Sequence, residues 1–262
     1  EARGHGTEQL IGAFHQLGGK VRRRVIALKA LASTITIGTG GSAGAEGPVT
    51  QIGSGIGSAV SDVLGFSERD RRLFLLAGSS AGAYGAATHF GRIRDVFPSG
   101  RAVMLGDAGQ GVTTPDFVER RNGNWRYDLP ENVFGRDAQL TDDEDIVARL
   151  AARFPQDRFA QYTTAHDVTQ SAFYALMGAS NACEAWTAKM ATDLNARQQR
   201  AANFRSYLAN GQSHTILRTP LFYTEQSGGA PFAEWLRALL AEAPPENRAC
   251  AECLAERVRC RF

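Results

Sequence analysis

Short, mostly apolar runs alternate with amphipathic runs of helical period through the last two-thirds of the chain. The apolar runs predict buried strands at 73–77, 102–106, 159–163 and 204–209. Helical patterning separates or follows them at 82–97, 142–154, 167–178, 186–203 and 231–243. Strands separated by helices indicate a parallel sheet with crossover connections. We therefore expect an α/β fold with flanking helices over residues 73–245, with a long loop at 109–135.

Residues 1–72 follow a different pattern. Helix formers dominate 22–37, a glycine-rich loop follows at 38–47, and Pro48 suits the first turn of another helix. That second helical stretch, 49–64, contains several glycines, which cost about 1 kcal/mol each inside a helix in water. Such glycines are favoured where helices approach closely, as in a membrane bundle. We expect this segment to be mainly helical and glycine-rich.

Composition supports a division near residue 73. Every Trp, Tyr, Cys and Met lies beyond residue 72. The net charge of +2 gives no electrostatic argument for nucleic acid as a partner. No window of about 20 residues is uniformly apolar, so hydropathy predicts no simple transmembrane helix. We expect three parts: an N-terminal segment at 1–72, an α/β portion at 73–245 and a cysteine-containing tail at 246–262.

Three of the four cysteines lie in the tail. Cys250 and Cys253 have CxxC spacing, which fits a zinc knuckle, a redox pair or a local disulfide. Neither a second CxxC nor a Cys/His pair completes a zinc site, so we expect no metal and no other cofactor. The pairing of these two cysteines with each other, with Cys183 or with Cys260 stays open.

The strongest chemical signal is the motif Gly78-Ser-Ser-Ala-Gly82, a GxSxG pattern between a predicted strand and a predicted helix. A sharp strand-to-helix turn lifts the central hydroxyl above the sheet, which makes Ser80 the candidate nucleophile. The backbone N–H of Ala81, at the helix N-terminus, is the candidate donor to a developing oxyanion. The alternative is a turn of small residues in which a serine caps the helix.

A serine nucleophile needs a base, and the base needs an orienting acid. The chain order in this fold is Ser, acid, His, so the base comes late in the sequence. His214 follows the fourth predicted strand at the carboxyl edge of the sheet and is the preferred base, whereas His166 is expected to point elsewhere. The preferred acid is Asp167, after the third strand. Asp107, after the second strand, is the alternative.

These residues also carry a family resemblance. The blocks 78–85, 92–98, 105–109, 214–217 and 222–223 resemble the pectin acetylesterase family, which includes the Notum-type carboxylesterases. The resemblance covers about residues 73–240 and implies an α/β-hydrolase fold. It also implies a serine carboxylesterase acting on O-acyl esters of a small molecule or polysaccharide, acetyl esters among them, in a secreted or periplasmic setting. Ser80, Asp167 and His214 are the triad that it implies.

Residues 4–77 resemble the CLC chloride channel and transporter family instead, most specifically across 29–53. Glu46, in Gly44-Ala-Glu-Gly-Pro48, falls on that family's gating glutamate. The resemblance implies a membrane location and chloride as a partner, with glycine N–H groups and helix N-termini supplying the anion site. The chain departs from the family at Ala45, where a basic residue is common, and offers at most three of the many membrane helices that a pore requires.

The hydrolase resemblance lacks its own upstream part. The loop that supplies a second oxyanion N–H should precede Gly78, where the chloride-channel-like segment stands. The strand-like run 34–37 and the glycine turn after it are one alternative source of that N–H. We therefore expect two segments of different origin and a serine carboxylesterase-like hydrolase, its oxyanion site incomplete. A fragment of an anion transporter is the alternative, and a folded chain with neither activity is the third possibility.

Overall fold

The computed structural model describes residues 20–39, 74–96, 100–125, 131–135, 144–250 and 252–255, with single positions at 9, 12–13, 16–17, 52, 55, 58–59, 62, 98 and 129. The Glu46 site expected from the sequence lies outside the described residues. The chain divides into two compact units, Glu1–Phe74 and Leu75–Phe262, and each is described by itself.

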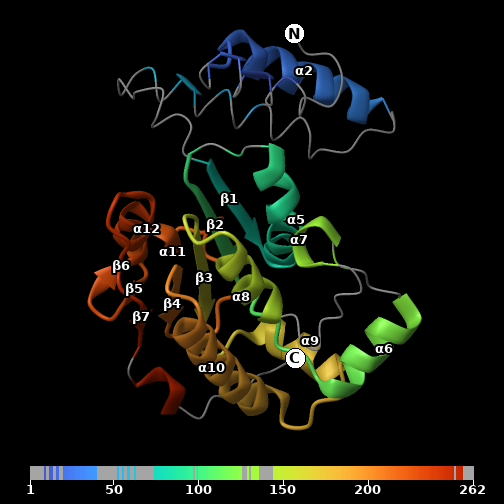
Figure 1. Ribbon diagram of the computed structural model, residues 1–262, viewed down its shortest axis with the longest axis vertical. Helices are drawn as coiled ribbons and strands as arrows, with labels where there is room; N and C mark the ends of the chain where they lie inside the picture. Colours follow the sequence, from blue (N-terminus) through green and yellow to red (C-terminus); the bar gives the residue numbers. More distant parts are fainter. Residues whose placement is uncertain are drawn as a thin grey trace. The chain divides into compact units, whose positions relative to one another are not determined.

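The first unit contains the helix α2, Arg24–Gly38 (Figure 1). Its β-branched end is helical: the hydroxyl of Thr34 donates to the carbonyl of Ala30 at 2.9 Å, and that of Thr36 donates to the carbonyl of Ala32 at 2.8 Å. A threonine within a helix can donate its hydroxyl in this way to the carbonyl of the residue four positions earlier. The mainly helical pattern expected for 22–37 agrees with α2, and the alternative of a strand-like run at 34–37 was wrong. No helix in the described part of the chain is both long and apolar enough to span a bilayer.

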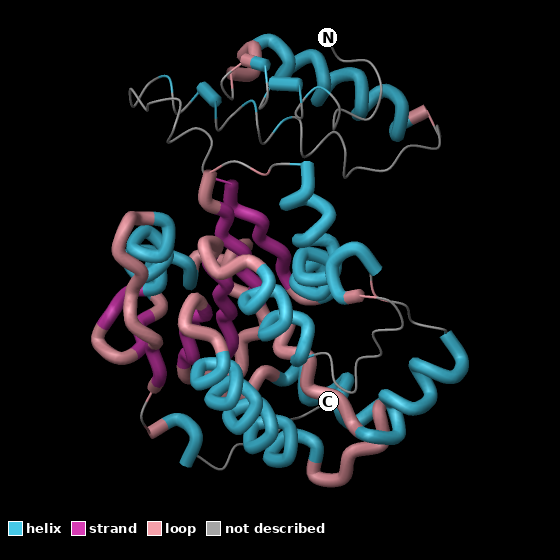
Figure 2. The backbone as a smooth tube through the Cα atoms, viewed as in Figure 1, coloured by secondary structure: helices cyan, strands magenta, loops and turns pink. Residues whose placement is uncertain are grey.

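The second unit is built on a five-stranded sheet with helices on both faces, which confirms the expected α/β class (Figures 1 and 2). The sheet order is β1-β2-β3-β4-β7, and the pairs β2–β3, β3–β4 and β4–β7 are parallel. Its strands are β1 Phe74–Ser79, β2 Ala102–Asp107, β3 Arg158–Thr164, β4 Phe204–Ala209 and β7 Arg248–Ala249. The helices are α5 Ala81–Val96, α6 Pro115–Trp125, α7 Glu131–Phe134, α8 Glu144–Arg153, α9 Val168–Leu176, α10 Ala182–Arg200, α11 Leu221–Thr224 and α12 Phe232–Leu240.

Alternation along the strands assigns the two faces. On β3, Gln161 accepts a hydrogen bond from Arg197 of α10, whereas the next residue, Tyr162, packs its ring edge-on against Phe232 of α12. Successive strand side chains point to opposite faces. Residues of α5 and α8 line a hollow together with Gln161 and Arg197. Helices α5, α8 and α10 therefore cover one face of the sheet, and α12 covers the other.

Aromatic side chains fill the α12 face. Tyr162 and Tyr207 are register partners on β3 and β4, and their stacked rings lie 6.0 Å apart. Tyr207 meets Phe232 edge-on at 5.3 Å and Trp235 at 5.4 Å. Paired aromatic rings in these geometries contribute beyond the area they bury. This cluster fixes the carboxyl halves of β3 and β4, where the site residues follow.

The long loop expected at 109–135 was wrong in part, because it contains α6 and α7. The sequence holds a helix start that was overlooked. The hydroxyl of Thr114 accepts from the N–H of Phe117 at 3.3 Å, Pro115 is the first helical residue, and Asp116 follows in the first turn. A capping threonine, a proline at the first position and an acid in the first turn all favour a helix N-terminus.

The C-terminal region adds elements that hydrophobic patterning did not predict. The two-residue strand β7 extends the sheet beside β4, and β5 (Gln226–Ser227) and β6 (Ala230–Pro231) form a small antiparallel ladder. Helix α10 begins at Ala182, four residues before the expected start at residue 186. Strands of two residues are too short to show a period, which explains why they were missed.

Candidate functional site

The candidate nucleophile lies in a tight strand-to-helix turn. Strand β1 ends at Ser79 and α5 begins at Ala81, so Ser80 is the single residue between them. Its φ is +56°, in the left-handed region that non-glycine residues seldom adopt. Such a conformation persists only where the surrounding structure enforces it. Here the N–H of Ser80 donates to the carbonyl of Asp107 at 2.7 Å, and the Ser80 carbonyl accepts from the N–H of Ala83 at 2.9 Å.

Close backbone approach explains one glycine of the motif. A Cβ atom on Gly78 would overlap the carbonyl group of Gly82, so only glycine fits there. Gly109, on the loop after β2, is constrained in the same way by the Cβ atom of Ala83. At Gly82 itself, an added Cβ would meet nothing within 4 Å. The turn is therefore built on the approach of α5 to the end of β1 and to the loop after β2.

A continuous series of hydrogen bonds joins the three residues that the sequence nominated. The Nε2 atom of His214 lies 2.7 Å from Oγ of Ser80. The Nδ1 atom of the same ring lies 2.8 Å from Oδ2 and 3.0 Å from Oδ1 of Asp167. Ser80 follows β1, Asp167 follows β3 and His214 follows β4, so three strand ends at one edge of the sheet bring these side chains together.

Asp167 is held firmly. The carboxylate is fully buried and also caps α9, where Oδ1 accepts from the N–H of Gln170 at 2.9 Å. The side-chain amide of Gln170 donates to Oδ2, also at 2.9 Å. Hydrogen bonds from neutral donors stabilise the ionised form of a buried carboxylate. Asp167 therefore caps α9 and contacts the imidazole of His214 at the same time.

The partners determine the chemistry open to His214. An ionised carboxylate only accepts hydrogen bonds, so the Nδ1 atom of His214 carries the proton when Asp167 is charged. The Nε2 lone pair then faces the hydroxyl of Ser80. This is the tautomer that lets imidazole accept a proton from a serine hydroxyl. The arrangement can therefore activate an oxygen nucleophile without a metal.

Asp107, the alternative acid, has different partners. Its carboxylate is fully buried and accepts from the hydroxyl of Ser79 at 2.6 Å. It also accepts from the backbone N–H groups of Ile216 at 3.0 Å and Leu217 at 3.1 Å. The Nδ1 atom of His214 is directed at Asp167 instead. In the sequence Asp107 was a candidate only as the rival acid, and no residue pattern indicated these contacts.

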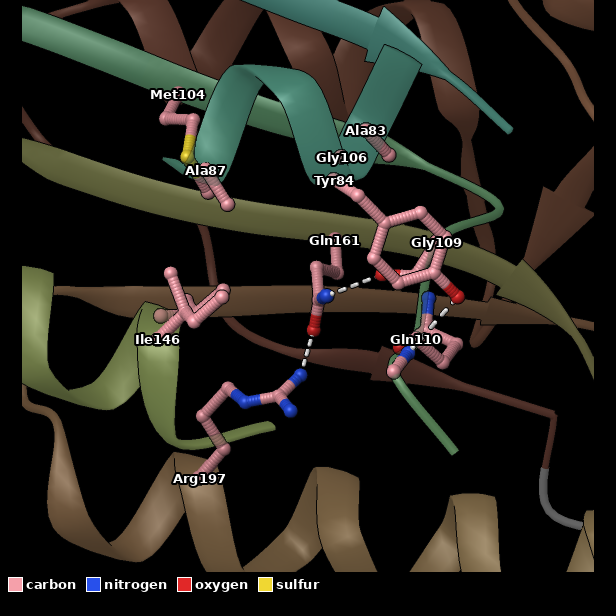
Figure 3. A pocket seen from close by; sticks show the side chains of 12 residues that line it. Ala83, Tyr84, Ala87, Met104, Gly106, Gly109, Gln110, Ile146, Gln161 and Arg197 are labelled. Atoms are coloured by element: carbon pink, nitrogen blue, oxygen red, sulfur yellow. Dashed lines mark hydrogen bonds between the residues drawn. The ribbon is translucent and has the colours of Figure 1, made fainter. Parts of the chain in front are cut away.

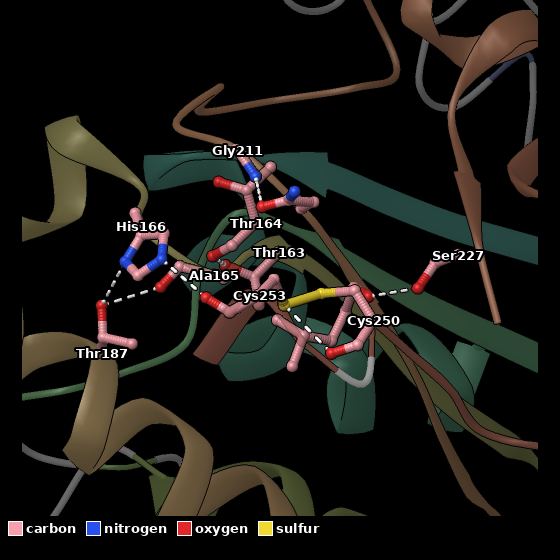
Figure 4. The surroundings of a disulfide bond; sticks show 11 residues. Thr163, Thr164, Ala165, His166, Thr187, Gly211, Ser227, Cys250 and Cys253 are labelled. Atoms are coloured by element: carbon pink, nitrogen blue, oxygen red, sulfur yellow. Dashed lines mark hydrogen bonds between the residues drawn. A yellow bond between two sulfur atoms is a disulfide. The ribbon is translucent and has the colours of Figure 1, made fainter. Parts of the chain in front are cut away.

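His166, which also follows β3, turns away from Ser80. His166 is buried, with Nε2 2.8 Å from the carbonyl oxygen of Cys253 and Nδ1 3.2 Å from the hydroxyl of Thr187 (Figure 4). It joins the turn after β3 to α10 and to the short helix at Cys253–Ala255. The expectation that His166 points elsewhere agrees with this placement.

The three cysteines that the structure describes are disulfide-bonded. Cys250 pairs with Cys253 across the CxxC spacing, beside β7 (Figure 4), and Cys183 is disulfide-bonded as well. A local disulfide was one of the three alternatives that the sequence left open for this pair. Among the described residues, no group of three or more His, Cys, Asp or Glu side chains is placed to hold a metal ion.

A small hollow lies beneath the first turns of α5, between Tyr84, Met104 and Ile146 (Figure 3). A buried polar chain crosses it: Arg197 donates to Oε1 of Gln161, whose amide nitrogen donates to the carbonyl of Gly109 at 2.9 Å. The adjacent N–H of Gln110 donates to the side chain of Gln170 at 3.0 Å. These bonds fix the loop after β2 directly below the turn that carries Ser80.

Burial shifts the pKa values of two further groups, Tyr162 and Glu225. Burial raises the pKa of the Tyr162 phenol well above its ordinary value, and the negative charges of Glu225 and Asp107 raise it further. Burial also raises the pKa of Glu225, against a smaller opposing effect of the N–H of Gln226. The shift at Tyr162 disfavours an additional negative charge close to Asp107 and Asp167.

Ala81 is the first residue of α5, so its N–H is among the helix-initial donors that have no partner within the helix. This is the position that the sequence nominated for contact with an oxyanion. The alternative that a strand-like run at 34–37 leads to the second donor lacks this basis, because those residues are helical.

Comparison with known proteins gives two separate likenesses. Residues 1–87 match the family model described as voltage gated chloride channel. The H⁺/Cl⁻ exchange transporter ClcA of Vibrio campbellii is 34% identical over 87 residues, which are 33% of this chain and 19% of that protein. ClcA of Vibrio cholerae El Tor is 33% identical over the same share. The chain thus spans about a fifth of the length of these curated relatives.

Among solved structures, the Wnt deacylase Notum from Drosophila is similar with a TM-score of 0.46 and 15% identity, over 78% of this chain and 66% of that one. Both resemblances noted in the sequence recur in these comparisons. The chloride-channel match runs to residue 87, beyond the limit of residue 77 expected from the sequence, and so includes Ser80 and the first turns of α5.

Proposed function

We propose that residues 73–245 act as a serine carboxylesterase, with Ser80 as nucleophile, His214 as general base and Asp167 as the acid that orients it. The main support is the pair of contacts on one imidazole ring, 2.7 Å to Oγ of Ser80 and 2.8 Å to Oδ2 of Asp167. These contacts join residues from three strand ends, and the left-handed Ser80 adds the backbone strain typical of such a nucleophile.

The reaction follows from these contacts. The Nε2 atom of His214 takes the proton of the Ser80 hydroxyl while Oγ attacks the ester carbonyl, and Asp167 stabilises the resulting imidazolium. The N–H of Ala81 donates to the oxyanion that forms. His214 then returns its proton to the departing alcohol, and water cleaves the acyl-enzyme by the reverse sequence. The substrate is an O-acyl ester of a small molecule or polysaccharide.

Hydrolysis of p-nitrophenyl acetate tests the proposal. We expect the complete chain to release p-nitrophenol with burst kinetics, because the first turnover forms the acyl-enzyme. Ser80→Ala should abolish the burst, and Ser79→Ala, which keeps the hydroxyl of Ser80, should retain one. A burst of equal size in Ser80→Ala would sink the assignment of the nucleophile.

A second candidate function is anion transport by a larger assembly to which residues 1–87 contribute. It is supported by the family match and by 34% identity to ClcA over 87 residues. Glu46 is its proposed gate. Chloride efflux from liposomes containing the chain, compared with Glu46→Ala, is the test. We expect a change in efflux rate in that variant, and equal background leak with and without either protein would dismiss the candidate.

A further inference from the structure

We propose that Asp107 is a positioning residue of the esterase site, whose carboxylate ties the turn carrying Ser80 to the loop carrying His214. This inference rests on the proposed function. It assigns a role to a fully buried carboxylate that the reaction itself leaves unused.

Asp107 contacts the turn that carries Ser80. The carbonyl of Asp107 accepts from the N–H of Ser80 at 2.7 Å, and its Oδ2 accepts from the hydroxyl of Ser79 at 2.6 Å. These bonds hold Ser79, the last residue of β1, and Ser80, the single residue between β1 and α5. They oppose relaxation of Ser80 from its left-handed conformation at φ +56°.

Asp107 also contacts the loop after β4, which carries His214. Oδ1 of Asp107 accepts from the N–H of Ile216 at 3.0 Å, and Oδ2 accepts from the N–H of Leu217 at 3.1 Å. These residues follow His214 by two and three positions. The carboxylate thus holds the chain on each side of the 2.7 Å contact between His214 and Ser80.

A charged carboxylate suits this position because it is purely an acceptor, and each of the three groups that it meets is a donor. Asparagine has the same shape but presents one acceptor oxygen and one donor NH₂. In Asp107→Asn, at least one backbone N–H or hydroxyl would face another donor, and the loop or the turn would shift. A displacement of about 1 Å at a reacting group can cost about 100-fold in rate.

The experiment compares Asp107→Asn with Asp167→Asn in the complete chain, with p-nitrophenyl acetate as substrate. We expect Asp107→Asn to lower kcat about 10- to 100-fold with KM nearly unchanged. The acidic limb of its pH profile should stay in place, and the downfield proton on His214 Nδ1 should persist, since Asp167 still holds it. Asp167→Asn should shift the acidic limb of the pH profile and remove the downfield proton on His214 Nδ1. A kcat within about twofold of wild type in Asp107→Asn, or loss of the downfield proton, would overturn the inference.

Ser79→Ala provides a milder variant in case Asp107→Asn fails to fold. It removes only one of the three donors and should lower kcat about 3- to 10-fold with an unchanged melting temperature. In the double variant the two effects should not add, because they act through one contact. Wild-type kcat in Ser79→Ala, or additive effects, would contradict the role.

An inactive wild-type chain would refute the proposed function and still leave the Asp107 contact testable. The ¹⁵N shifts of the His214 ring report its place beside Ser80 without turnover. We expect them to change in Asp107→Asn. Identical shifts in the two proteins would overturn the positioning role by itself.

Discussion

The Nδ1 atom of His214 lies 2.8 Å from Oδ2 of Asp167, although 47 residues separate them in the chain. Asp167 is fully buried, and its other hydrogen bonds come from Gln170. The buried carboxylate therefore fixes both the orientation and the tautomer of the imidazole, and the ring carries this geometry to Ser80.

Replacement of that carboxylate should remove most of the activity and leave the fold. In Asp167→Asn, the side-chain amide can donate to Nδ1, which favours the tautomer with its proton directed at Ser80. We expect kcat to fall by about 10³- to 10⁴-fold, the range typical of such a change in Ser-His-Asp enzymes. Steady-state hydrolysis measures this, with circular dichroism as the control for folding. A loss of less than tenfold would argue for another acid.

The turn at Ser80 should tolerate a methyl group at one glycine and reject it at the other. Gly78→Ala places a Cβ atom against the carbonyl group of Gly82, and overpacking of this kind costs about 1–3 kcal/mol or more. Gly82→Ala meets open space and also improves helix propensity within α5. Urea denaturation of both variants gives the comparison. Equal stabilities would mean that β1 and α5 do not approach as described.

Alkaline pH should weaken the fold partly through Tyr207. Burial raises the pKa of its phenol to about 12, and the hydroxyl donates to the carbonyl of Ala230 at 2.6 Å. The folded state therefore keeps the proton longer than the unfolded state. This stabilisation is complete below about pH 10 and is lost as the pH rises through about 12.

Tyr207→Phe tests that account. It should cost about 1 kcal/mol at pH 8 through the lost hydrogen bond. Between pH 10 and 12, the unfolding free energy of the wild type should fall more steeply than that of the variant, because phenylalanine has no proton to lose. Parallel pH curves for the two proteins would contradict the raised pKa.

Glu225 should show the same preference for the protonated form, at the acidic end of the pH scale. Its pKa is raised by burial, so the folded state binds the proton more tightly than the unfolded state, and ionisation above the folded pKa costs stability. Glu225→Gln keeps an oxygen acceptor for the N–H of Gln226 and removes the charge. Since the side chain is only half-buried, we expect a modest rise in melting temperature, about 1–2 °C at pH 7. The gain should disappear below pH 4, where wild-type Glu225 is protonated.

The strands that carry the site were predictable because they are short, apolar and separated by helical periods. The same reasoning placed Ser80, Asp167 and His214 at strand ends. It could not give the contacts of Asp107, because the sequence around a carboxylate at a strand end does not show which groups it meets. Asp107 meets donors from the end of β1 and from the loop after β4, not a histidine. That distinction depends on how the loop after β4 folds over the sheet.

Elements without a hydrophobic period were also not predicted correctly. Helix α6 is polar and contains Gly123, so its pattern resembled a loop even though Thr114 and Pro115 mark its start. In α2, the β-branched residues 34–37 suggested a strand. The helix continues through them, and the hydroxyls of Thr34 and Thr36 donate to carbonyl groups of the preceding turn. Local propensity was outweighed by context in both cases.

Labelling by a fluorophosphonate probe tests the central claim most directly, because the probe reacts only with a serine whose hydroxyl is activated. The intact chain should gain one adduct, and peptide mapping should place it on Ser80. Ser80→Ala should remain unlabelled, and His214→Ala should label far more slowly. No adduct on the folded wild-type chain, or an adduct that persists in Ser80→Ala, would contradict the account.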